Sequence, residues 1–105
     1  MVHLWHREVM HWKRAQKGRN KLRRSLTSRQ FEQFVATERG MLVRLAMNIL
    51  HHPEDADDAV AEALCKAWER REQLRSPDKM RSWVAKITVN TALSMIQKRK
   101  RVELV

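Results

Sequence analysis

Apolar residues recur at intervals of three and four along most of this chain, which is the spacing of helices with a buried face. The first such stretch follows Thr27, which stands three positions before Gln30 in the arrangement of a capping box. We expect a long helix from there, with Gly40 as its weak point because glycine lowers helix stability. The apolar face of this helix comprises Phe31, Phe34, Val35, Leu42, Leu45, Ala46, Ile49 and Leu50.

A second helix is expected to begin at Pro53, because proline suits the first turn and the acids after it favour the positive end of the helix dipole. Its apolar stripe comprises Ala56, Ala59, Val60, Ala63, Leu64, Ala67 and Trp68. At about 100° per residue, a group of acids falls on nearly the opposite side. We call this group the acidic face and expect it to point to solvent: Glu54, Asp55, Asp58 and Glu62.

A loop is expected over residues 72–79, because Ser76-Pro77-Asp78 is a turn signal and proline disfavours helix at the residue before it. The third helix then runs from about Met80 to Lys100 with two apolar stripes. One comprises Met80, Trp83, Val84, Ile87, Thr91 and Met95, and the other Ala85, Val89, Ala92, Leu93 and Ile96. Such a helix must be covered on both sides or keep one stripe for a partner.

Polar residues at spacings of seven, four and seven separate these two stripes. We call them the polar strip and regard it as the best candidate for reading a nucleic acid: Lys79, Lys86, Asn90 and Gln97.

The pattern as a whole predicts an all-α protein. With 105 residues, two glycines, two prolines and no alternating apolar run, the chain is expected to form one domain with a modest core. We expect a basic extension over residues 1–26, a compact bundle of three to four helices over 27–101, and over 102–105 a tail or the start of a linker.

The distribution of charge along the chain indicates which class of partner it binds. The formal net charge is +10, the excess lies at the two ends of the chain, and residues 81–101 contain no acid. Such a balance points to nucleic acid first and to an anionic membrane surface second. The third helix ends in the basic run Lys98, Arg99, Lys100 and Arg101. Contact with DNA phosphates is favoured over a merely solubilising helix end, because the same helix carries Lys86 and Asn90.

Several classes of protein and site are excluded by what the sequence lacks. No stretch approaches the roughly 18 apolar residues of a membrane span, and Met1 is not followed by the apolar run of a signal peptide, so we expect a cytoplasmic protein. Cys65 is the single cysteine, which rules out an internal disulfide and a cysteine-based zinc site. No phosphate-binding glycine loop or paired nucleophile and base is recognisable, so we expect no enzymatic activity, cofactor or metal.

Taken in order, these segments resemble region 2 of the extracytoplasmic-function (ECF) sigma factors, a group of the sigma-70 family of bacterial initiation subunits of RNA polymerase. The resemblance runs from about Phe31 to Arg101. It is carried by residues 31–34 (FEQF), 42–46 (LVRLA), 53–60 (PEDADDAV), 66–68 (KAW), 81–84 (RSWV), Ile87 and Asn90.

This resemblance implies a role for each charged surface. The second helix of the family docks on the coiled coil of the largest subunit of core RNA polymerase, which implies polymerase contacts for Asp55, Asp58 and Glu62. The third helix and the loop before it bind the non-template single strand of the minus-ten promoter element and help to open the duplex, which implies DNA contacts for Arg81, Lys86 and Asn90. At the end of that loop and along the same helix, we add as DNA-binding candidates Lys79, Gln97, Lys98, Lys100 and Arg101.

Some positions depart from the family pattern. This chain has Ala61, Cys65, Val89 and Ser94 where the family usually has glutamine, leucine, arginine and aspartate. One polymerase contact and one DNA contact are therefore expected to be missing. The helix-turn-helix domain that reads the minus-thirty-five element in the family is not supplied by residues 1–105, which suggests the first domain of a longer factor or a truncated form.

Two alternatives remain open from the sequence. The chain could be a small helical adaptor whose apolar stripe binds a partner helix, for instance that of an anti-sigma regulator. It could also be a helix-turn-helix module that binds duplex DNA, although no short turn between two compact helices supports this. Trp68 and Trp83 are expected in the core, whereas the role of Trp5 and Trp12 is undecided.

Overall fold

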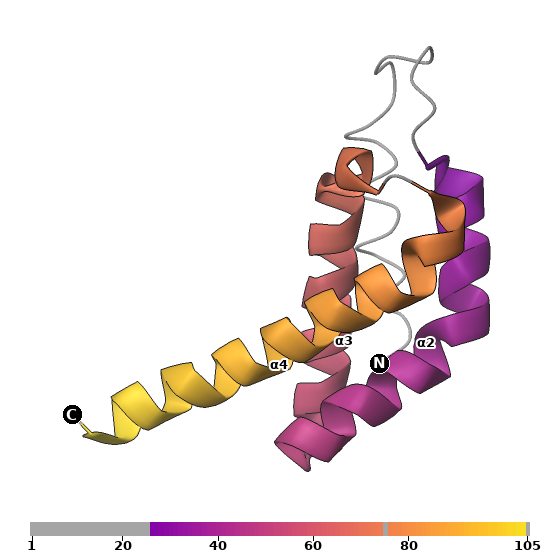
Figure 1. Ribbon diagram of the computed structural model, residues 1–105. Coiled ribbons are helices and arrows are strands. Elements are labelled where there is room, and N and C mark those ends of the chain that lie inside the picture. Colours follow the sequence, from indigo (N-terminus) through magenta and orange to yellow (C-terminus); the bar gives the residue numbers. More distant parts are fainter. Residues whose placement is uncertain (1–25, 75, 105) are drawn as a thin grey trace.

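The structure is a computed structural model that describes residues 26–74 and 76–104. In this part of the chain the order is α2 (Ser28–Leu50), α3 (Pro53–Glu69), the 3₁₀ turns η1 (Arg71–Gln73) and η2 (Pro77–Lys79), and α4 (Met80–Leu104). Each long helix packs against the other two, and α4 crosses α3 before its last turns extend past it (Figure 1). The predicted all-α class is confirmed. Residues 1–25 of the extension predicted over 1–26, with Trp5 and Trp12, lie outside the described residues, whereas Leu26 is buried in the core.

Helix α2 begins at the predicted capping box. The Thr27 side chain accepts a hydrogen bond from the Gln30 amide at 3.1 Å, and the Gln30 side chain accepts one from the Thr27 amide at 3.0 Å. Two backbone N–H groups without an intrahelical partner are satisfied in this way. The helix ends at His51, which adopts the left-handed conformation at φ 57° and donates its amide to the Met47 carbonyl at 2.8 Å.

Pro53 occupies the first turn of α3, as predicted. The connection after α3 is more ordered than the predicted loop, because it contains η1 and η2. Ser76 is extended before Pro77, and its side chain accepts a hydrogen bond from the Asp78 amide at 3.4 Å. Met80 then begins α4 as predicted, but the helix continues to Leu104, so residues 102–104 form no separate tail.

The core lies where the apolar faces of the three helices meet. Phe31 of α2 and Trp68 of α3 are both buried, with ring centroids 5.3 Å apart. The Arg71 guanidinium lies over the Trp68 ring at 4.2 Å from its centroid and donates to the Trp68 carbonyl at 2.8 Å. This cation–π contact closes the end of the core where α3 gives way to η1.

Helix α4 contributes a buried face that contains two hydroxyl groups. The Thr88 and Thr91 side chains donate to the carbonyls of Val84 and Ile87 at 2.9 and 2.7 Å, so neither is unsatisfied. The first predicted stripe of α4 faces this core. Of the second stripe, Ala92 is buried and Leu93 is exposed. No helix among the described residues is long and apolar enough to cross a membrane.

Gly40 lies within α2 on the exposed side, where an added Cβ would meet only the end of the Arg44 side chain at 3.8 Å. Replacing it by alanine removes the entropic cost of a helical glycine without creating a clash. We expect Gly40→Ala to raise the free energy of unfolding by about 0.5–1 kcal/mol, measured by urea denaturation followed by circular dichroism. A loss of stability would show that α2 requires glycine for its path.

Candidate nucleic-acid and protein interfaces

The polar strip lies on the solvent side of the bundle. Lys79 ends η2, while Lys86, Asn90 and Gln97 follow along α4, and all four are exposed. Val84, Thr88 and Thr91 on the opposite face are buried, so the helix cannot roll without opening the core. The strip is therefore held in a fixed direction, with two lysines followed along the chain by two amides.

Arg81, at the start of α4, does not stand free. Its Nε lies 2.7 Å from Oε1 of Glu38 on α2, although 68% of its side chain remains exposed. This ion pair joins the start of α4 to α2. An exposed pair of this kind contributes only about 0–1 kcal/mol, so a phosphate can compete with Glu38 for the guanidinium.

The basic run at the end of α4 divides into a paired and an unpaired part. Arg99 forms an ion pair with Asp55 at the start of α3. Lys98, Lys100 and Arg101 are exposed, and within the described part of the chain they have no ion-pair partner. Three cations are thus available near the end of α4, in the part of the helix that extends past α3 (Figure 1).

The acidic face of α3 is less uniform than the sequence suggests. Glu54, Asp58 and Glu62 are exposed, whereas Asp55 is half-buried because Arg99 covers it and His52 lies 3.6 Å away. The expectation that all four acids point freely to solvent is therefore wrong for Asp55. Among the described residues, Asp58 has no ion-pair partner.

Glu62 and Lys66 connect the acidic face to α4. Lys66 Nζ lies 3.1 Å from Glu62 Oε2 and donates to Thr91 Oγ1 at 3.3 Å, so one ammonium group joins α3 to the buried face of α4. Asp57, outside the acidic face, pairs with Arg39 of α2 at 3.3 Å. These pairs fix how the acidic face is oriented relative to the other two helices.

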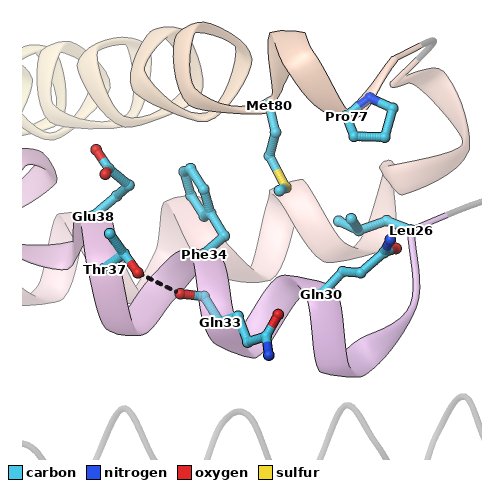
Figure 2. A pocket seen from close by; sticks show the side chains of 8 residues that line it. All are labelled: Leu26, Gln30, Gln33, Phe34, Thr37, Glu38, Pro77 and Met80. Carbon is cyan, nitrogen blue, oxygen red and sulfur yellow. Dashed lines mark hydrogen bonds between the residues drawn. The ribbon is translucent and has the colours of Figure 1, made fainter.

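A pocket of about 380 Å³ lies between the first half of α2 and the segment from η2 into α4. Phe34 and Met80 project toward each other across it, with Pro77 at one end (Figure 2). The remaining lining residues are Leu26, Gln30, Gln33, Thr37 and Glu38. The hollow is largely open to solvent, and its apolar floor is edged by amide and hydroxyl groups and by the Glu38 carboxylate. Such a surface suits a flat ligand that has hydrogen-bonding edges.

The sequence did not reveal this pocket. Phe34 belongs to the predicted apolar stripe of α2, and nothing in that periodicity distinguishes a residue of a pocket wall from one in the core. Lys79 and Arg81 flank Met80 in the chain, which places predicted cationic residues beside the pocket. Trp83 is half-buried and packs against the core, as expected.

A match to a protein-family model identifies the family. The family described as Sigma-70 region 2 matches residues 34–102, which include most of α2 and all of α3, η1 and η2. The chain therefore belongs to the sigma-70 region 2 family, and the resemblance to ECF sigma factors is confirmed.

A curated relative makes the likeness more specific. The chain is similar to RNA polymerase sigma factor SigV of Bacillus subtilis (strain 168), with 36% identity over 61 residues. The match spans 58% of this chain and 37% of the relative, so it concerns only part of that protein. No solved structure matches the chain.

Proposed function

We propose that this chain acts as the region 2 module of a sigma factor in transcription initiation. In this proposal the acidic face of α3 binds core RNA polymerase, and α4 with η2 binds the non-template strand of the minus-ten element and helps to keep it open. The chain itself carries out no catalysis. The observation that carries the proposal is the acid-free polar strip, exposed along a helix whose other face is locked into the core.

The chemistry of the strip fits a single strand of DNA. Holding unpaired bases requires cations for phosphates, hydrogen-bonding groups for base edges, and an apolar surface for an extruded base. Lys79 and Lys86 supply the cations, while Asn90 and Gln97 supply the amides. The pocket lined by Phe34 and Met80 supplies an apolar surface at the start of α4, where Lys79 precedes Met80 in the chain.

On the protein-binding side, Asp58 is the strongest candidate for contact with polymerase. It is exposed and, among the described residues, has no ion-pair partner. A basic partner can therefore form an ion pair with Asp58 without breaking an ion pair inside this chain. Glu62 and Asp55 already have cationic neighbours. We assign both to the same interface, where a basic partner surface exchanges with Lys66 and Arg99.

The first test compares DNA forms by fluorescence anisotropy of the chain bound to core RNA polymerase. We expect a single-stranded minus-ten oligonucleotide to bind more tightly than its duplex. If three phosphates of the single strand are neutralised, the logarithm of the association constant should fall with the logarithm of the salt concentration with a slope of about −2. Equal and weak binding of both forms would instead favour the adaptor function, in which the basic ends are incidental.

Two substitutions test the division between the surfaces. Asn90→Ala should weaken single-strand binding about tenfold, as expected for loss of a base-edge contact, and leave polymerase binding unchanged. Asp58→Arg should do the reverse, because like charges would face each other at the polymerase interface.

Each substitution has a matched control at an exposed position away from the proposed interface. Asn48→Ala removes another exposed amide, on α2, and Glu69→Arg makes the same change in charge at the far end of α3. Both should behave as wild type in both assays. If Asn90→Ala and Asp58→Arg impaired the same partner equally with the fold intact, the two surfaces would not be separate.

The ion pair between Glu38 and Arg81 gives another prediction. Glu38→Gln should release Arg81 and strengthen single-strand binding about threefold, within the range of about 0–1 kcal/mol for an exposed pair. The gain should disappear when Arg81 is also replaced by glutamine. An equal gain in the Arg81→Gln background would assign the effect to the charge of Glu38 itself, which also lines the pocket, and would remove Arg81 from the DNA contacts.

A further inference from the structure

Leu93 is exposed in the middle of α4. Among the described residues, the large apolar side chains that are exposed are Leu93 at 46% and Val102 at 75%. A single exposed leucine is ordinary on a protein surface, so exposure alone indicates nothing. The position of Leu93 relative to the polar strip is what gives it meaning.

Leu93 lies in line with two exposed lysines. Lys86 precedes it by seven residues and Lys100 follows it by seven. Seven residues make just under two helical turns, so each step rises about 10 Å along the axis and drifts only about 20° around it. The three side chains therefore form one row, with a cation at each end and the leucine between them.

A second row runs beside the first and carries amides. Asn90 lies three residues before Leu93 and Gln97 four residues after it, which are the spacings of neighbours on a helix surface. Both amides are exposed. Leu93 thus has a hydrogen-bonding side chain on its own face in each direction along the helix.

This arrangement indicates the chemistry of what covers Leu93. The ligand must be anionic at intervals, must offer hydrogen-bonding edges to amides, and must carry an apolar group between its charges. In DNA, phosphates supply the first, base edges the second, and the 5-methyl group of thymine the third. A protein segment rich in acids would satisfy the cations but would place no apolar group there by necessity.

We infer that Leu93 is a specificity-determining residue that contacts the 5-methyl group of a thymine in promoter DNA lying along α4. The inference rests on the proposed function and refines it by naming the base. Lys86 and Lys100 hold phosphates on either side, while Asn90 and Gln97 face the edges of adjacent bases. DNA with thymine at the position opposite Leu93 is then preferred over DNA with uracil or another base there.

The experiment first selects the DNA and then removes methyl groups one at a time. The wild-type chain with core RNA polymerase selects its tightest binders from a pool of forked duplexes with a randomised melted segment and adjoining base pairs. Each thymine of the selected DNA is then replaced singly by deoxyuridine, which differs only in lacking the methyl group. At one position we expect affinity to fall about fourfold, the loss for withdrawing one methyl group from an apolar contact.

Variants of the chain assign that loss to Leu93. Leu93→Ala should bind the selected DNA less tightly and should no longer distinguish thymine from deoxyuridine at that position. Leu93→Met should keep most of the discrimination, because it retains an apolar side chain of similar volume. Val102→Ala, at the other large apolar residue found exposed in the described part of α4, should discriminate as wild type does. Circular dichroism should show all variants folded.

Several results would overturn the inference. These are tolerance of deoxyuridine at every position by the wild-type chain, or discrimination that persists in Leu93→Ala. Another is a Leu93→Ala variant that loses polymerase binding while its DNA binding is unchanged, which would assign the leucine to a protein contact. Selection of no DNA at all would remove the proposed function as well, whereas selection without methyl sensitivity would remove only this inference.

Discussion

The structure depends on the burial of one face of α4 between α2 and α3. Val84, Thr88 and Ala92 have no measurable exposure, and the threonine hydroxyl is satisfied within its own helix. Since that face is fixed in the core, the opposite face is fixed toward solvent, and its polar side chains need no structural partner. One packing interaction therefore both stabilises the bundle and presents the surface that we assign to DNA.

Ion pairs at the surface have a different part in this structure. Arg81 with Glu38 and Arg99 with Asp55 join α4 to each neighbouring helix, but all four groups keep some exposure. Pairs of this kind are weak in water and weaken further with salt. They orient the side chains in the free protein but are weak enough to break. This suits residues that exchange one ion-pair partner for another when a larger ligand binds.

Much of the fold follows from local patterns in the sequence. The capping box at Thr27, the proline in the first turn of α3 and the turn at Ser76 each act within a few residues, so their outcomes could be predicted. The spacing of apolar residues likewise identified the buried stripes, including Trp68. The end of α4 was placed too early, because a basic run contains no residue that stops a helix.

The candidate site was less predictable, because it depends on contacts between residues far apart in the chain. The sequence placed the polar strip on one side of a helix, and the exposure of Lys86 and Asn90 agrees. It gave no sign that Arg99 covers Asp55 or that Glu38 holds Arg81, since both pairs depend on how α4 crosses the other helices. The pocket between Phe34 and Met80 was missed for the same reason.

Helix α4 is continuous from Met80 to Leu104, and this continuity constrains how the chain can evolve. An insertion of a single residue near its middle would turn everything downstream by about 100° and advance it by about 1.5 Å. Arg99 would then point away from Asp55, and Lys100 would leave the row that it shares with Lys86. Substitutions along this helix can therefore alter the interface gradually, whereas changes in its length would separate the two ends of that interface in one step.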